Sequence, residues 1–207
     1  MPQIVTQLGN QQLRVIRPDA IDLKRADSEL RRLADAGHLL QLSKGFYTLV
    51  PENRRRKPVT WRPTIEGAAL GMAAALYGPD AVALVGPSAA RAHRCYPRAL
   101  GAAYVTVPQK LRTRETAVGS VSFVNRAIDK MDTVRVDTDL GSGWATSIEN
   151  SALDLCRNRP DWKISEATRS EMINQLAKRI DWELIEDLAV SLRAVKTLAR
   201  LKQYVEA

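Results

Sequence analysis

Three arginines in the middle of the chain, Arg91, Arg94 and Arg98, have the residue type and spacing for binding anions. They lie in and just after one predicted helix, residues 87–96. Arg91 and Arg94 are three positions apart, so their side chains can project from one helix face. Guanidinium groups bind carboxylates and phosphates through paired hydrogen bonds. We predict contact with an acidic protein pocket or with nucleotide phosphates; the alternative is a solvated helix face.

A second group of cations lies near the N-terminus, where the positive charge is concentrated. Residues 1–60 hold 11 Lys and Arg against 6 Asp and Glu, whereas residues 161–207 hold 8 of each, within a net charge of +8. A basic N-terminal part favours a nucleic acid or an acidic protein as partner. If the protein binds DNA, we expect the residues at the groove to be Lys24, Arg25, Ser28, Arg31 and Arg32.

Further phosphate contacts are expected from a turn and a linker. Lys44 precedes Gly45 in a predicted turn, and a run of cations follows it, namely Arg54, Arg55, Arg56 and Lys57. Acidic residues in the same region oppose the electrostatic attraction that dominates DNA affinity, namely Asp27, Glu29 and Asp35. The alternative is that all these cations are solvated surface charges.

Four aspartates close together in sequence are the main candidates for a metal site. Carboxylates at such spacing can bind magnesium, but we interpret them as solvated hairpin residues: Asp129, Asp132, Asp137 and Asp139. Neither the cysteines nor the histidines have partners at ligand spacing, namely Cys95, Cys156, His38 and His93. We interpret the cysteines as small buried residues, and we predict no disulfide and no metal site.

Motifs for enzymatic chemistry are not found in the sequence. It contains no phosphate-binding loop, no His-Glu-x-x-His motif and no recognisable kinase-type catalytic loop. Gly141-Ser142-Gly143 shares only a fragment with nucleotide-binding loops, and we interpret it as a plain turn. The sequence therefore identifies no catalytic residue.

The first 50 residues have the pattern of a winged helix-turn-helix. Leu30, Leu33 and Ala34 form an apolar stripe in a helix over 27–36, with Asp27 or Ser28 as its cap and Gly37 at its end. Two apolar runs around Ser43-Lys44-Gly45 then predict a β-hairpin. Residues 18–24 would hold the preceding helix. Only 17 residues precede Pro18, so a first helix is short or missing.

Residues 51–63 read as a basic linker, because three prolines and four consecutive cations argue against regular structure. Residues 64–207 then form a mixed α/β domain. Its first helix is expected over 65–76, capped by Thr64, and Gly67 and Gly71 suggest close approach of a neighbouring element. Strands are expected at 81–85, 102–107, 118–124 and 133–137, a helix from Ser147, and a helical tail over 164–205 with a cap at Asp181. The predicted class is α+β.

The apolar content, 45%, is enough for a sizeable core. No stretch approaches the roughly 18 apolar residues of a membrane span. The N-terminus lacks the pattern of a signal peptide. These features predict a cytoplasmic protein without a membrane partner.

Several segments together resemble the AbiEi family of abortive-infection antitoxins. In order they are "SELRRLADAGHLLQLSKGFYTLV", "AVALVGPSAARAHRCYPRA", "AAYVTVP" and "WATSIENSALDLC". They are similar to the family's wing, its Ser-Ala helix, its central strand and its strand-to-helix step, and they cover roughly residues 20–160. The length and the basic linker look closest to the MenA-type actinobacterial subset.

The resemblance implies a winged helix joined to an α/β domain with a helical C-terminus. It also implies a partner, a nucleotidyltransferase toxin, which Arg91, Arg94 and Arg98 would contact. For systems like the MenA-type subset, neutralisation by phosphorylating a serine of the toxin has been proposed, and only that mechanism implies ATP and magnesium as cofactors. Two compatible functions follow: an antitoxin that acts on the toxin, and a DNA-binding repressor of its own operon.

Overall fold

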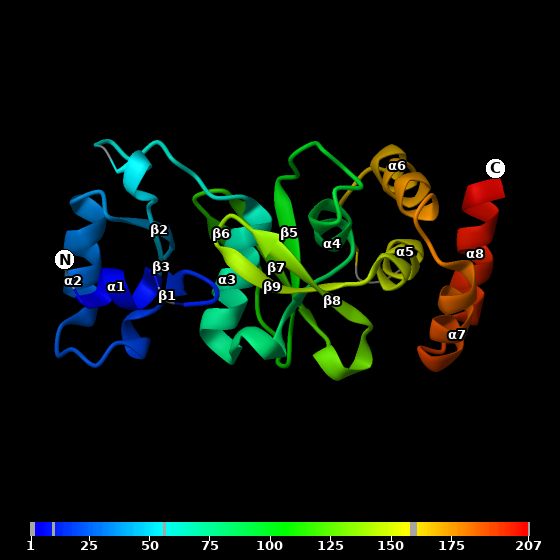
Figure 1. Ribbon diagram of the computed structural model, residues 1–207, viewed down its shortest axis with the longest axis horizontal. Coiled ribbons are helices and arrows are strands. Elements are labelled where there is room, and N and C mark those ends of the chain that lie inside the picture. Colours follow the sequence, from blue (N-terminus) through cyan, green and yellow to red (C-terminus); the bar gives the residue numbers. More distant parts are fainter. Residues whose placement is uncertain (1–2, 10, 56, 158–160, 207) are drawn as a thin grey trace.

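The computed structural model describes residues 3–9, 11–55, 57–157 and 161–206 (Figure 1). The protein is of mixed α and β structure and contains two sheets. Helices α1 and α8 lie at opposite ends of an elongated molecule, with a six-stranded sheet between them. No helix among the described residues is both long and apolar enough to cross a membrane.

The N-terminal unit contains a small antiparallel sheet with the strand order β1-β3-β2. Its elements in chain order are α1 (Gln3–Gly9), β1 (Val15–Ile16), the 3-10 turn η1 (Pro18–Ala20), α2 (Ala26–Asp35), β2 (Leu39–Ser43) and β3 (Phe46–Leu49). The apolar stripe of α2 packs inward, because Leu30 and Leu33 are buried in one cluster with Ile4, Leu8 and Tyr47. Gly37 has a φ of 79° after α2, as expected for a residue that ends a helix.

The helix expected over residues 18–24 is wrong. Only the single 3-10 turn η1 forms, in which the Ile21 N–H donates to the Pro18 carbonyl at 3.2 Å. Ile21 then takes an extended conformation, and α2 begins only five residues later. The Ile21 N–H is already used in an i→i+3 bond, and the three residues of η1 are too few to form the i→i+4 bonds of an α-helix.

The cap expected for α2 is also wrong. The helix begins at Ala26, and Arg25 occupies the cap position without a side-chain hydrogen bond to the backbone. Asp27 lies inside the first turn, where its carboxylate pairs with Arg31 at 2.6 Å. Once the helix has begun at Ala26, a carboxylate one position later can no longer accept from the free amides of the first turn.

The linker of residues 51–63 has little regular structure, as expected. Its one short element among the described residues is the 3-10 turn η2 (Glu52–Arg54). It leads into α3 (Ile65–Tyr77), whose start is capped by Thr64: the Gly67 N–H donates to Thr64 Oγ1 at 3.2 Å. The predicted cap is confirmed, and the helix ends one residue beyond the predicted range, before Gly78.

The second sheet has the strand order β6-β7-β5-β4-β9-β8. Its strands are β4 (Ala83–Leu84), β5 (Ala102–Val107), β6 (Arg114–Thr116), β7 (Gly119–Asn125), β8 (Thr133–Thr138) and β9 (Gly141–Thr146). Pairs β5–β7 and β4–β9 are parallel and the others antiparallel. Helix α4 (Pro87–Ala92) connects β4 to β5, and the 3-10 turn η4 (Ile128–Lys130) connects β7 to β8; the 3-10 turn η3 (Pro79–Ala81) precedes β4, and α5 (Ile148–Cys156) follows β9.

Both faces of this sheet are covered, which the strand β5 shows directly. Ala103 and Val105 belong to the cluster that includes α3, whereas Tyr104 points to the opposite cluster, which includes residues of α4 and α5. Alternating residues of a strand face opposite sides of the sheet, so a strand covered on both faces is apolar throughout. This explains the mostly apolar run from Ala102 to Val107, in which the buried Thr106 is the one polar residue and its hydroxyl bonds to the Ala83 backbone.

The turn expected at Gly141-Ser142-Gly143 is wrong, because these residues form the first half of β9. The glycines are needed for space. A Cβ at Gly143 would lie 2.5 Å from Leu70 Cδ2 of α3, and one at Gly141 would overlap the Gln12 carbonyl. Glycine in a strand often marks such close approach.

Three further helices form the C-terminal part, as expected: α6 (Glu166–Ala177), α7 (Trp182–Ser191) and α8 (Val195–Glu206). Asp181 caps α7, since its carboxylate accepts from the Glu183 and Leu184 N–H groups at 3.1 Å each. The three helices share one apolar cluster with α5 and Trp162.

One apolar cluster contains residues of both the N-terminal unit and the six-stranded sheet. Helix α3 lies between the two sheets (Figure 1), and its cluster includes Val15, Leu42 and Phe46 of the N-terminal unit. The close approach predicted at Gly67 and Gly71 is confirmed: a Cβ would overlap Asp139 Oδ1 at the first and Val15 Cγ2 at the second. The two units are therefore packed together rather than merely tethered by the linker.

Candidate functional site

Arg91 lies in a small polar pocket between the start of α3, the end of α4 and the β8–β9 turn. The pocket has a volume of about 260 Å³ and is lined by Thr64, Glu66, Arg91, Ala92, Arg94, Asp137, Thr138 and Asp139. Arg91 Nε donates to Glu66 Oε1 at 2.6 Å, and the two side chains are only 14% and 6% exposed. The pair holds the guanidinium in a fixed orientation.

The Arg91 guanidinium retains donor capacity. Its Nη1 is buried and has no hydrogen-bond partner among the described residues. A buried donor without a partner costs free energy, which a ligand oxygen would recover. The acceptors nearby are already engaged, since Asp139 binds the Thr64 N–H and hydroxyl, both at 2.7 Å. An external carboxylate or phosphate is a suitable partner for the free Arg91 nitrogen.

Arg94 lines the same pocket, but not from the helix face expected from its spacing. Helix α4 ends at Ala92, and Arg94 has a left-handed backbone with a φ of 61°. The Cys95 N–H donates to the Ala90 carbonyl at 2.9 Å, which closes the helix end at this residue. Arg91 and Arg94 therefore meet at one pocket although they do not share a helix face.

Arg98 lies apart from this pocket. It pairs with Glu171 of α6, and its guanidinium carbon is 4.9 Å from the centre of the Tyr96 ring. This ion pair is exposed, so it ties the 96–98 segment to α6 only weakly. The structure thus brings two of the three predicted arginines together.

The exposed face of α2 carries the cations predicted to contact DNA. Arg31 pairs with Asp27 at 2.6 Å, and Arg32 forms two hydrogen bonds with Glu29 at 2.7 and 2.8 Å. The hydrogen bonds from Arg32 lower the pKa of Glu29. These pairs are solvent-exposed and exchange readily for other anions.

The other predicted DNA contacts differ in availability. Lys24, Arg25, Ser28, Lys44, Arg54 and Lys57 are exposed. Arg55, in contrast, is used within the fold: it donates to the Val50 carbonyl at 3.1 Å and pairs with Glu52. Arg56 lies outside the described residues.

The four aspartates do not form a metal site. Asp137 and Asp139 lie at the β8–β9 turn, where Asp137 accepts from the Ser142 hydroxyl. Asp129 and Asp132 come before the start of β8, at the opposite end of the strand from Asp137. Among the described residues no group of three or more His, Cys, Asp or Glu side chains could hold a metal ion.

The cysteines are free and buried, and burial raises the pKa of the Cys156 thiol to about 12. His93 is partly buried, and its Nε2 lies 2.7 Å from the Thr146 carbonyl. Burial lowers the pKa of His93, which favours the neutral ring with its proton on Nε2. These side chains stabilise the fold rather than forming a reactive pair.

A buried ion-pair cluster lies on the opposite side of the sheet from α3 and was not predicted. Asp154 of α5 is 2% exposed and accepts from Arg126 Nη1 at 2.9 and 3.1 Å, with Arg157 Nη1 at 3.7 Å. Sequence reasoning missed it because 28 positions separate Asp154 from Arg126. The cluster fastens the segment after β7 to α5.

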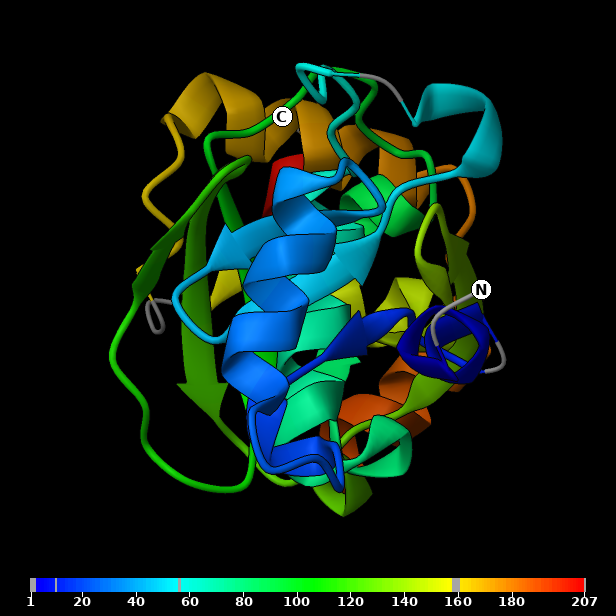
Figure 2. The ribbon, with the colours of Figure 1, turned by 90° about the vertical axis from the view of Figure 1, so that its left-hand side faces the viewer.

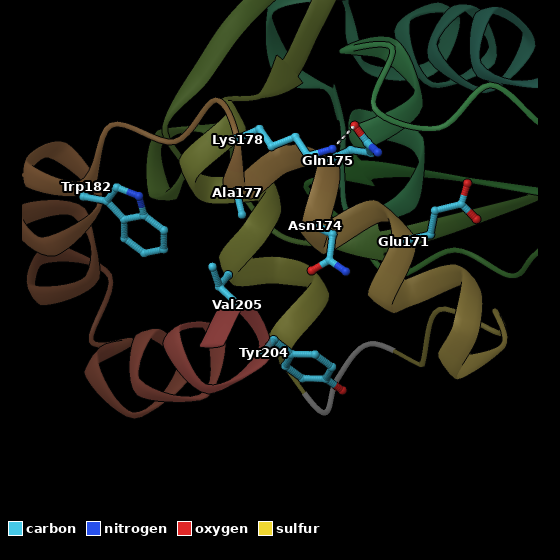
Figure 3. A pocket seen from close by; sticks show the side chains of 8 residues that line it. All are labelled: Glu171, Asn174, Gln175, Ala177, Lys178, Trp182, Tyr204 and Val205. Carbon is cyan, nitrogen blue, oxygen red and sulfur yellow. Dashed lines mark hydrogen bonds between the residues drawn. The ribbon is translucent and has the colours of Figure 1, made fainter. Parts of the chain in front are cut away.

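A hollow of about 810 Å³ lies between α6, α7 and α8 (Figure 3). Its polar groups are mainly amides and one lysine, and Lys178 Nζ donates to Gln175 Oε1 at 3.4 Å. Glu171 is bound by Arg98. Trp182, Ala177 and Val205 give this hollow an apolar wall. The hydroxyl of Tyr204, another of its lining residues, donates to the Glu166 carboxylate.

No family model matches the sequence, and no curated protein matches it. The AbiEi resemblance therefore stays a prediction that depends on the quoted segments and on the fold.

Proposed function

We propose that this chain is an antitoxin of the AbiEi type, which neutralises a nucleotidyltransferase toxin and carries a winged-helix unit at its N-terminus. The observation that carries the proposal is the topology of the N-terminal unit. Helix α2 runs directly into the β2–β3 hairpin, and β1 pairs with β3 to give the order β1-β3-β2. A helix followed at once by a two-stranded wing is the arrangement of a winged helix-turn-helix protein.

The succession of parts further along the chain supports the same proposal. The N-terminal unit is followed by a sheet with helices on both faces and then by α6, α7 and α8. This is the order that the AbiEi resemblance implies. The segment "AVALVGPSAARAHRCYPRA" spans β4 and α4 and supplies Arg91 and Arg94 of the polar pocket.

The polar pocket is the surface we propose for the toxin. Its free Arg91 nitrogen and the exposed Arg94 suit a carboxylate of a metal-binding nucleotidyltransferase pocket, or a phosphate of its nucleotide. Loss of one charge-assisted hydrogen bond costs about 1.5–3 kcal/mol, which corresponds to about tenfold or more in affinity.

The test is growth rescue by the full-length chain co-expressed with its cognate toxin. Arg94→Ala should weaken rescue. Arg193→Ala is a matched control, because Arg193 is also an exposed arginine with a left-handed backbone, at a φ of 51°, in the α7–α8 turn. Equal rescue by both variants would overturn the assignment of the pocket. Failure of the wild-type chain to rescue would overturn the antitoxin proposal itself.

The mechanism of neutralisation is tested with the purified proteins. Incubation of toxin with this chain and magnesium–ATP, followed by intact mass measurement, distinguishes the two mechanisms. A toxin heavier by one phosphoryl group supports phosphorylation, whereas co-elution of the two proteins at unchanged mass supports direct binding.

A second candidate function is repression of the chain's own operon. It is favoured by the winged topology and by the exposed cations of the N-terminal unit, among them Lys24, Arg25 and Lys44. Binding of duplex DNA from its promoter at low salt would support this function. No binding at low salt would exclude it, since phosphate attraction is strongest there.

A further inference from the structure

The ring of Phe46, at the start of the second strand of the wing, contacts one arginine from each of the two units of the protein. The guanidinium carbons of Arg17 and Arg114 lie 5.6 and 5.3 Å from the ring centre. Arg17 follows β1 of the N-terminal unit, whereas Arg114 begins β6 of the six-stranded sheet. Phe46 is 2% exposed, so the ring is a fixed support for both arginines, through attraction of their charge to its face.

A backbone hydrogen bond fixes the two units at the same place. The Ala117 N–H, in the turn between β6 and β7, donates to the Leu42 carbonyl at 2.7 Å. Strand β2 lies at the edge of its sheet, so this bond attaches the second unit directly to the wing. In Figure 2 the β2–β3 hairpin and the chain leading into β6 lie on the same side of the molecule.

The chain that leads into β6 is exposed and basic. Lys110, Arg112 and Arg114 are exposed in the segment 108–114, as is Lys44 at the tip of the wing. No ion pair between described residues involves any of these four cations. The acidic groups nearby are Asp19, which pairs with Arg17, and the exposed Glu115.

We propose that the segment 108–114 of the second unit extends the DNA-contacting surface of the wing and binds backbone phosphates beside Lys44. This inference rests on the DNA-binding function proposed above. Cations without a counter-charge on one side of the molecule repel one another, and a row of phosphates relieves that repulsion while releasing counterions. The contacts carry no base readout, so they raise affinity for any duplex sequence.

The experiment measures binding of the full-length protein to duplex DNA by fluorescence anisotropy, from about 50 to 200 mM salt. The test variant is Lys110→Gln with Arg112→Gln. The matched control is Lys163→Gln with Lys196→Gln, which removes the same two charges from exposed positions near α6 and α8. Both variants change the net charge equally, so a difference between them reports local contacts.

The test variant should lower the magnitude of the salt slope by about two, because each phosphate contact contributes about 0.9. The same slope implies an affinity loss of about 10- to 100-fold at about 0.1 M salt. The control should keep the wild-type slope. A third variant, Lys44→Gln, reports the wing itself and should lower the slope by about one.

The outcomes separate the two proposals. A wild-type slope in the Lys110/Arg112 variant, with a reduced slope in Lys44→Gln, would overturn this inference and leave the wing as a DNA-binding element. No duplex binding by the wild-type chain would overturn both. Growth rescue of toxin-expressing cells is measured separately and does not depend on either result.

Discussion

A double-mutant cycle at Gly71 and Val15 tests the close packing of α3 against β1. A Cβ at Gly71 would overlap Val15 Cγ2 and lie 3.2 Å from Val15 Cβ. Because valine is stiff at χ1, rotation of its side chain cannot clear the contact. Overpacking of this kind costs about 1–3 kcal/mol. Replacing a helical glycine by alanine returns about 1 kcal/mol, so Gly71→Ala should lower stability by about 0–2 kcal/mol.

The cycle isolates the steric part of this effect. The helix-propensity gain is the same whether residue 15 is Val or Ala, so it cancels in the coupling free energy. In the Val15→Ala background, Gly71→Ala should therefore be about 1–3 kcal/mol more favourable than in the wild type. Urea denaturation followed by far-UV circular dichroism and by tryptophan fluorescence gives the four stabilities; circular dichroism also reports the N-terminal unit, which contains no tryptophan. Since one apolar cluster contains residues of both units, we expect a single cooperative transition.

Gly101→Ala is the control, because a Cβ at Gly101 has no atom within 4 Å. It should change stability by less than about 0.5 kcal/mol. Two results would refute the reasoning. One is a coupling free energy near zero, and the other is separate unfolding transitions for the N-terminal unit and the rest of the chain.

Three other substitutions test the packing around the sheet. Asp154→Asn leaves Arg126 without its buried counter-charge and should lower the free energy of unfolding by about 3–5 kcal/mol in thermal denaturation; an unchanged melting temperature would contradict this. His93 has a pKa lowered by burial, so protons bind the unfolded chain preferentially and stability falls as pH drops from about 6.5 towards the folded pKa. His93→Gln should flatten that part of the pH profile, and an identical profile would exclude the assignment. Gly86→Ala places a Cβ 2.8 Å from the Trp162 ring, on a residue with a φ of 52°. Backbone strain and overpacking together should lower the free energy of unfolding by about 2–5 kcal/mol. A loss of less than about 1 kcal/mol would show that the ring can move aside.

Local signals in the sequence predicted helix starts well where a side chain reaches its own backbone. Thr64 and Asp181 were identified as caps from residue type and position alone, and both accept the expected N–H groups. The same reasoning failed at Asp27, because α2 begins one residue earlier, at Ala26, so that Asp27 lies inside its first turn. A cap can be predicted from residue type only where the first residue of the helix is predicted correctly.

Glycine was informative in one context and misleading in another. At Gly67 and Gly71 the helical pattern around them showed that the missing side chains made room for a neighbour. At Gly141 and Gly143 the same residue type suggested a turn. The chain there is a strand, and the Gln12 backbone and the Leu70 side chain pack closely against its two glycines. A glycine signals freedom of conformation or close packing, and only the surrounding structure distinguishes them.

The sequence by itself determined the helices α2, α3 and α5, the helical tail, the strand β5 and the cationic character of the N-terminal part, because these depend on periodicity and composition over a few neighbouring residues. The tertiary structure decided which charges remain available. It paired Arg91 with Glu66 while leaving one nitrogen free, and it brought Arg114 to the ring of Phe46 from 68 positions away. These contacts depend on how α3 packs between the two sheets. A local sequence pattern cannot predict a contact between residues so far apart in the chain.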